Sequence, residues 1–232
     1  KDPYGKYNGN EQKYVNMVLD SENLEVRKNP FSKRFEKAFA ERFGTKYAIA
    51  HNSGTGTLHS CLASLGVGAG DEVISPAQTV IMLSFATLYL NAIPVYADID
   101  SETFNIDPED IVSKITNKTK AIIVVHMHGL PADMNRIMEI GKNYGIPVIE
   151  DSAQCVLGKI NGQLAGTFGD MASFSFETKK HLSAGEGGIV ITSNKKYAEI
   201  IRKVAGLGFQ TLTAAGGLSA KLSSEFQNPD YK

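Results

Sequence analysis

Short apolar runs alternate along this chain with longer stretches of helical periodicity. The runs are rich in Val and Ile and short enough to be strands. They are apolar throughout instead of alternating with polar residues, which is typical of strands buried on both faces. The seven runs cover residues 47–50, 72–75, 94–97, 121–125, 147–150, 172–176 and 188–192.

Helical segments lie between these runs. In the first of them Phe35, Phe39 and Phe43 are four residues apart and would share one face. The candidate helices are residues 32–43, 55–65, 79–90, 107–115 and 134–144. Strands that alternate with helices predict an α/β domain of three layers, in which a mostly parallel sheet carries helices on both faces.

Three segments fall outside this alternation. Residues 158–169 contain four glycines and predict a small surface hairpin or loop. Residues 1–30 form an N-terminal segment whose Tyr14, Met17 and Leu19 we expect to pack on a partner or on another domain. Residues 206–232 are rich in Gly, Ala, Ser and Gln and read as a connector. The large domain would then cover residues 31–205.

Composition excludes some classes of function. The formal net charge of −1 on 232 residues gives no overall field that would attract nucleic acid or an anionic membrane. No run of about 18 apolar residues is present, so no spanning helix is expected. Cys61 and Cys155 lie far apart, and we expect buried free thiols in a reducing cytoplasm.

Candidate chemistry lies just after the predicted strands, where ligands collect in sheets of this kind. The segment Asn52-Ser-Gly-Thr-Gly-Thr57 could bring backbone amides and a helix start to a phosphate, although a plain tight turn with an N-cap fits equally. The segment Glu150-Asp-Ser-Ala-Gln154 ends a strand with acidic residues. These could serve as a metal ligand, a base, a partner for a cationic ring or an N-cap.

Two further segments complete the set. The strand 172–176 leads to Lys179 and Lys180 and then to Gly185-Glu-Gly-Gly188, which allows close backbone packing, although the lysines could simply be solvated. His126 and His128 are two apart and would face opposite sides of an extended segment, which argues against a metal pair. We expect a ligand-facing His126 and no metal.

Taken in order, these segments resemble the DegT/DnrJ/EryC1/StrS family of pyridoxal-phosphate (PLP) dependent nucleotide-sugar aminotransferases, which have the aspartate-aminotransferase-like fold, fold type I. The resemblance runs from about residue 31 to residue 202. Its motifs are Phe35-Glu-Lys-Ala-Phe-Ala40, Ser53-Gly-Thr55, Pro94-Val-Tyr-Ala-Asp-Ile-Asp100, His126-Met-His-Gly129 with Pro131-Ala-Asp-Met134, Glu150-Asp-Ser-Ala-Gln154, and Ser175-Phe-Glu-Thr-Lys-Lys180 through Gly185-Glu-Gly-Gly188.

The resemblance implies roles for individual residues. Lys180, five residues after Ser175, would form the Schiff base with PLP, and Asp151 would pair with the pyridinium nitrogen. Val80 stands where the family often has an aromatic residue that stacks on the ring. The other implied contacts are Gln154 to the ring 3-oxygen, Gly54, Thr55 and Ser175 to the phosphate, and His126 and Glu186 to the substrate.

The implied function is transfer of an amino group, with glutamate as donor, to a nucleotide-linked keto-deoxy sugar. The implied assembly is a homodimer with shared active sites. The family continues into a smaller C-terminal domain, which we expect to be absent or truncated here because the chain ends at Lys232.

Three alternative functions compete with this one. A PLP-dependent sugar dehydratase of the same family would carry His at the lysine position; Lys180 argues against it, although His181 follows directly. A non-enzymatic regulatory protein that retains the cofactor site lacks support from any basic patch or DNA-binding motif. A dinucleotide-binding protein would need G-x-G-x-x-G after the first strand, and that motif is missing there.

Overall fold

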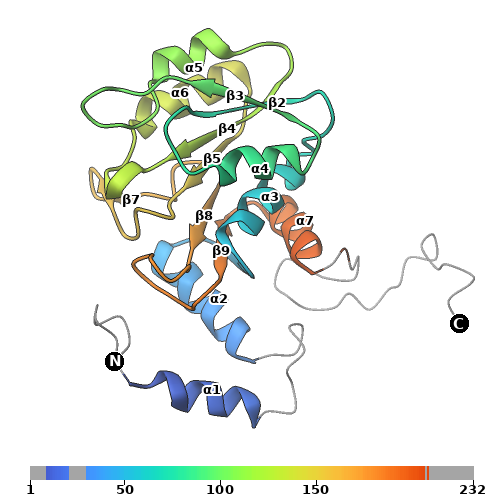
Figure 1. The fold of residues 1–232 in the computed structure, drawn as a ribbon, viewed down its shortest axis with the longest axis vertical. Coiled ribbons are helices and arrows are strands. Elements are labelled where there is room, and N and C mark those ends of the chain that lie inside the picture. Colours follow the sequence, from blue (N-terminus) through green and yellow to red (C-terminus); the bar gives the residue numbers. More distant parts are fainter. Residues whose placement is uncertain (1–8, 21–29, 207, 209–232) are drawn as a thin grey trace, which may run out of the picture.

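A seven-stranded sheet forms the centre of the molecule (Figure 1). The computed structural model describes residues 9–20, 30–206 and 208. The strand order is β1-β9-β8-β5-β4-β2-β3. Neighbours from β3 to β8 are parallel, whereas β9 is antiparallel to both β8 and β1, so the mostly parallel sheet is confirmed. The strands are β1 (Tyr47–His51), β2 (Glu72–Pro76), β3 (Ile93–Ala97), β4 (Thr119–Val125), β5 (Val148–Asp151), β8 (Met171–Ser175) and β9 (Gly188–Thr192).

Helices cover both faces of this sheet, which confirms the three-layer prediction. Leu62, Leu83 and Ile201 from α3, α4 and α7 are buried together with Ile123 of β4 on one face. Helices α5 and α6 pack against the other face beside Val124, and α2 continues that layer across β8 and β9. The helices are α1 (Glu11–Leu19), α2 (Pro30–Phe43), α3 (Gly54–Ser64), α4 (Met82–Leu88), α5 (Pro108–Lys114), α6 (Met134–Tyr144), α7 (Lys195–Ala205) and the short 3-10 helix η1 (Met127–Gly129).

Local signals explain where most of these helices begin and end. Asp133 accepts a hydrogen bond from the Arg136 amide at 3.1 Å and starts α6, and Gly145 ends the helix in the left-handed region at φ 67°. Helix α4 is shorter than predicted and begins at Met82. Helix α7 was not predicted, although Asn194 caps it and its apolar residues recur at helical spacing.

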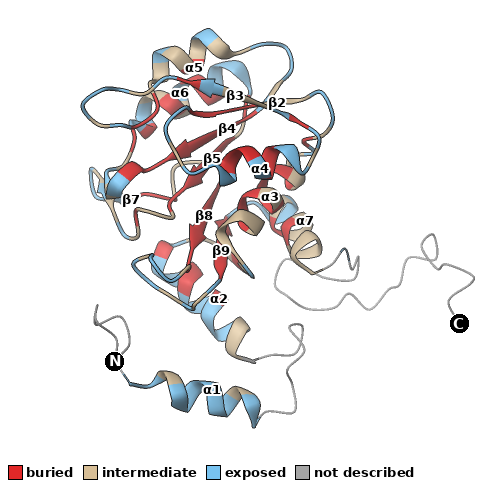
Figure 2. Cartoon of the chain, in the orientation of Figure 1, coloured by how far each residue is buried: buried red, intermediate tan, exposed pale blue. Residues whose placement is uncertain are grey.

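The segments outside the alternation are partly described. Residues 158–169 contain the predicted hairpin, formed by β6 (Lys159–Ile160) and β7 (Gln163–Leu164). Helix α1 buries none of its residues (Figure 2), and the partner for Tyr14, Met17 and Leu19 stays a prediction. Almost all of the expected connector 206–232 lies outside the described residues. Within the described part of the chain, no helix is long and apolar enough to span a membrane.

Candidate active site

A cavity of about 340 Å³ lies at the carboxyl ends of β5 and β8, beside the start of α3. Parallel strands end at the same edge of a sheet, so segments distant in sequence meet there. Six of the predicted site residues line it, namely Gly54, Thr55, Asp151, Ser175, Lys180 and Glu186. The remaining lining residues are Ser53, Leu58, Val80, Met82, Ala153, Ser173 and Glu177.

The start of α3 forms an anion-binding corner of this cavity. Ser53 caps the helix, since its Oγ accepts a hydrogen bond from the Gly56 amide at 3.0 Å. The amides of Gly54 and Thr55 precede the first intrahelical hydrogen bond, and the helix dipole is positive there. A Cβ added at Gly54 would lie 2.8 Å from Ser175 Cβ, so only glycine lets α3 approach β8 this closely. The corner suits a phosphate.

A buried hydroxyl pair joins α3 to β8 below that corner. Thr57 Oγ1 donates to the Gly54 carbonyl and is also hydrogen-bonded to Ser173 Oγ. Because the one Thr57 proton goes to the carbonyl, Ser173 is the donor to Thr57. Sequence reasoning missed both residues. The available signal was the alternation of Ser173 and Ser175, which places both on one face of β8.

Asp151 ends β5 with its side chain in the cavity wall, 3% exposed. Its Oδ1 accepts a hydrogen bond from the Ala153 amide at 3.0 Å. Burial raises the pKa of the Asp151 carboxyl, while the Ala153 hydrogen bond and the charge of Lys180 act in the opposite direction. A buried carboxylate of this kind fits a cationic partner in the cavity, such as a protonated ring nitrogen.

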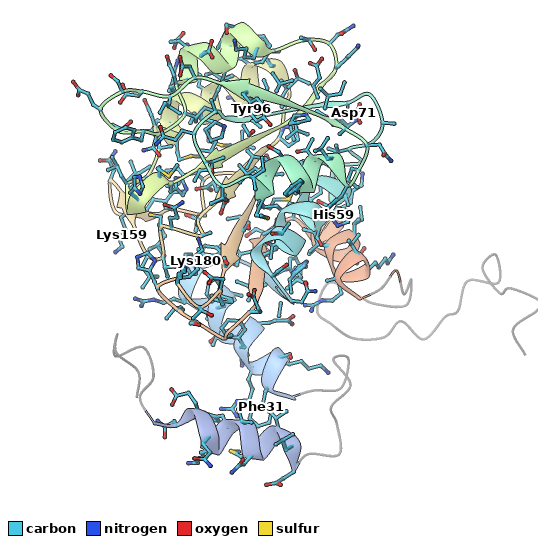
Figure 3. The ribbon with its side chains drawn as sticks, in the orientation of Figure 1. Phe31, His59, Asp71, Tyr96, Lys159 and Lys180 are labelled. Atoms are coloured by element: carbon cyan, nitrogen blue, oxygen red, sulfur yellow. The ribbon has the colours of Figure 1, made fainter. Side chains whose placement is uncertain are left out.

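Lys180 lies on the loop that follows β8 (Figure 3). Glu177 shapes this loop: its carbonyl accepts the Lys180 amide at 2.9 Å, and its carboxylate accepts the Lys179 amide at 3.0 Å. The turn brings Lys180 to the cavity, whereas Lys179 is exposed and outside the lining. Glu177 was not predicted as a site residue; its position two residues after Ser175 on the same loop was the available signal.

The structure does not bring His126 to the cavity. The side chain is fully buried; Nδ1 accepts the Ala132 amide at 3.2 Å, and Nε2 lies 2.9 Å from Glu150 Oε2. Both ring nitrogens are therefore occupied, and we do not assign His126 to the substrate. The expectation of an extended segment is also wrong, because His128 adopts φ 53° within a turn.

Gln154 and Val80 lie at the margins of the cavity. Gln154 Oε1 accepts the His128 amide at 3.1 Å, and the side chain is not part of the lining. Val80 does line the cavity and is 45% exposed, beside Met82 and Leu58. The wall where the family often has an aromatic residue is thus aliphatic in this chain.

The chain resembles known proteins over most of its length. Residues 6–224 match the model of the DegT/DnrJ/EryC1/StrS aminotransferase family. The chain is 44% identical over 187 residues to a GDP-perosamine synthase of Escherichia coli O157:H7, a match that covers 81% of this chain and 51% of that protein.

Solved structures give the same result. An aminotransferase from Psychrobacter cryohalolentis matches with a TM-score of 0.82 and 36% identity, over 86% of this chain and 51% of that one. A Bacillus subtilis protein, ntda, solved with bound cofactor PMP, matches with a TM-score of 0.75 and 32% identity, over 85% of this chain and 45% of that one.

The chain spans about half the length of the curated relatives it matches. Its mostly parallel sheet between two helix layers is the fold of the PLP aminotransferases of fold type I among its structural neighbours. Fold, motif order and family model agree, and the chain belongs to the DegT/DnrJ/EryC1/StrS aminotransferase family.

Proposed function

We propose that this chain is the cofactor-binding part of a cytoplasmic PLP-dependent aminotransferase that aminates a nucleotide-linked keto-deoxy sugar, with glutamate as donor. The observation that carries the proposal is the meeting of Lys180, Asp151 and the Gly54–Ser175 corner in one cavity. The similarity to a GDP-perosamine synthase supports a nucleotide sugar as substrate.

The residues present fit PLP. Gly54, Thr55 and Ser175 would hold the phosphate, and Asp151 would keep the ring nitrogen protonated. Lys180 would hold the cofactor through a Schiff base. When bound, PLP supplies an electron sink for the electron pair left behind as a proton leaves the donor carbon.

The side chains of the cavity would carry out proton transfer and substrate binding. The Nζ of Lys180 is the group that takes a proton from the donor carbon and returns it on the other side of the transfer. A positioned base of this kind contributes about 10²–10⁴-fold. The carboxylates of Glu177 and Glu186 line the same cavity and can accept hydrogen bonds from sugar hydroxyls. The net exchange converts the donor amine to a ketone and the sugar ketone to an amine.

Borohydride reduction tests the assignment of the lysine. Full-length protein saturated with PLP should carry one reduced adduct per chain, which peptide mass mapping places on Lys180. We expect Lys179→Ala to give the same adduct, since that side chain lies outside the cavity lining. An adduct on Lys179, or none at saturation, would refute the proposal.

We further propose that the active protein is a homodimer with shared sites. Among the described residues that line the cavity, Lys180 is the one cation, against the carboxylates of Asp151, Glu177 and Glu186. A phosphate-bearing ligand there needs more positive charge than a helix start supplies, which is equivalent to about half an elementary charge. Cationic groups from a second subunit would supply it.

An apolar surface beside the cavity supports this assembly. Ile81, the N-cap of α4, and Phe85 and Leu88 within the helix follow helical spacing and are exposed. The ring of Tyr89 stacks on Phe85 at 6.3 Å between centroids. The surface is continuous with the cavity, because the exposed residues Val80 and Met82 belong to both. In a dimer with its two-fold axis near α4, each subunit would cover this surface of the other and close the other's cavity.

Substitution of Tyr89 tests the dimer. Full-length protein should be a dimer by light scattering, and Tyr89→Glu should shift it to a monomer that binds PLP at least about tenfold more weakly, because a charge in an apolar interface is costly. Tyr144→Glu is the matched control, since Tyr144 is also an exposed tyrosine (51% against 62% for Tyr89) but lies on α6. A wild-type monomer with full activity would contradict the shared site.

A further inference from the structure

Glu150 is a fully buried carboxylate on the opposite face of β5 from Asp151. Its Oε1 accepts the amides of Phe168 at 2.8 Å and Gly169 at 2.6 Å. Its Oε2 accepts the Gly166 amide at 2.6 Å and lies 2.9 Å from His126 Nε2. These four contacts satisfy the carboxylate completely, and the cavity chemistry described above uses none of them.

Two glycines let the backbone reach Glu150. Gly166 has a φ of 91°, and a Cβ there would lie 2.8 Å from Phe174 Cζ. A Cβ at Gly169 would lie 2.7 Å from the Val148 carbonyl. The segment 152–169, here called the excursion, connects β5 to β8. It folds back against the face of the sheet that carries Glu150, and the amides at its C-terminal end donate hydrogen bonds to that carboxylate.

The protonation of His126 follows from its partners. An amide can only donate, so Nδ1, which accepts from Ala132, carries no proton. Nε2 therefore holds the single proton of a neutral ring and donates it to Glu150. Glu150 thus accepts four N–H donors and is deprotonated. It ties the turn after β4 to the excursion after β5.

Both segments that Glu150 joins, the turn after β4 and the segment 152–169, also donate hydrogen bonds to Asp151. The first turn of the excursion supplies the Ala153 amide that holds Asp151 Oδ1, and the His126 amide donates to the Asp151 carbonyl at 3.2 Å. Asp151, on the cavity face of β5, is therefore oriented by two segments that Glu150 holds from the opposite face of the same strand.

We propose that Glu150 is a positioning residue, which acts through the excursion 152–169 to hold the Asp151 carboxylate where it meets the cofactor. The inference rests on the proposed PLP site. Glu150→Gln is the sharpest test, because it keeps the shape and replaces one acceptor oxygen with a donor. His126 cannot adapt, since a ring without a proton on Nε2 would need one on Nδ1 and would lose Ala132.

Two measurements on full-length protein test the proposal. In the cofactor-free protein, amides of the 152–169 segment should exchange at least about tenfold faster in Glu150→Gln than in wild type, since a buried donor loses its acceptor. In PLP titrations, the dissociation constant should rise about tenfold. In an Asp151→Asn background the same change should add less than about threefold, because the effect acts through Asp151.

Glu36→Gln separates positioning from general destabilisation. Glu36 is also a buried carboxylate, paired with Arg202 and accepting the Ala50 amide at 2.9 Å, and it does not line the cavity. We expect this control to lower the melting temperature while PLP affinity stays at the wild-type value. Equal loss of affinity in Glu36→Gln, full additivity with Asp151→Asn, or unchanged exchange in Glu150→Gln would each overturn the proposal. Failure of wild type to bind PLP would instead refute the proposed function, and the exchange measurement would still test whether Glu150 holds the 152–169 segment in place.

Discussion

Replacing Lys180 with alanine should lower the rate of amino transfer by more than about 10⁴-fold in the full-length protein. The change would remove both the proposed base and the group proposed to hold PLP covalently, and such a base alone contributes about 10²–10⁴-fold. Steady-state turnover of donor and keto sugar measures the effect. The fold should survive, because Lys180 lies on a loop and its side chain is only partly buried.

Lys179→Ala is the matched control for that experiment. It removes the same charge one residue away, on an exposed side chain outside the cavity lining. Turnover within about twofold of wild type is expected, in line with the small effects of surface substitutions. Comparable losses in both variants would mean that the positive charge of the loop matters, and the assignment of Lys180 as the base would be abandoned.

Asp151→Asn should reduce turnover by about 10²–10³-fold, the size of effect seen when one positioned electrostatic group is removed. A neutral amide cannot hold the ring nitrogen in its protonated form, so the electron sink weakens. PLP affinity should fall as well. The substitution is nearly isosteric, and an enzyme with wild-type turnover would show that Asp151 only supports the turn at Ala153.

The same variant should be more stable than wild type when PLP is absent. Burial raises the pKa of Asp151 above its usual 3.8, so the folded state binds the proton more tightly than the unfolded state does. The ionised carboxylate therefore costs stability at neutral pH, and the amide avoids that cost. A higher melting temperature than that of wild type is expected at pH 7. The difference should vanish below about pH 4, where both states are protonated.

An exposed carboxylate provides the control for this pH dependence. Asp98 is exposed on the loop after β3, so Asp98→Asn should leave the melting temperature nearly unchanged at both pH values. If the two variants behaved alike, the stability change would come from net charge and not from burial.

Much of the fold could be predicted because the sheet is buried on both faces. Seven apolar runs correspond to the seven strands of the sheet, since strands such as β4 must be apolar on both sides. The site followed from that order: residues at the ends of parallel strands share one edge, which brings Gly54, Asp151 and Lys180 together. Helix α7 was not predicted, although Asn194 and the helical spacing of its apolar residues mark it.

What could not be predicted depends on contacts between distant segments. His126 was expected to face a ligand, but its partner Glu150 lies 24 residues further along the chain. The bond between Thr57 and Ser173 spans 116 residues. No local pattern encodes such pairs, because each half looks like an ordinary polar residue at a strand or helix end. The exposed apolar surface of α4 could not be predicted either, because the spacing of its apolar residues is also that of a helix buried in a core.

The antiparallel strand β9 has a consequence for how this site can vary. Ser175 pairs with Gly188, and the Phe176 amide donates to the Gly187 carbonyl at 2.9 Å, so the Lys180 loop leaves and rejoins the sheet between adjacent paired strands. A Cβ at Gly188 would lie 2.6 Å from the Ser53 carbonyl, which fixes the returning end against the α3 corner. Insertions or exchanges within residues 181–184, which follow Lys180 in this loop, would therefore alter the rim of the cavity and leave the strand register intact. The shape of the pocket can thus change at this one hairpin, while Lys180 stays in the same short loop between two paired strands.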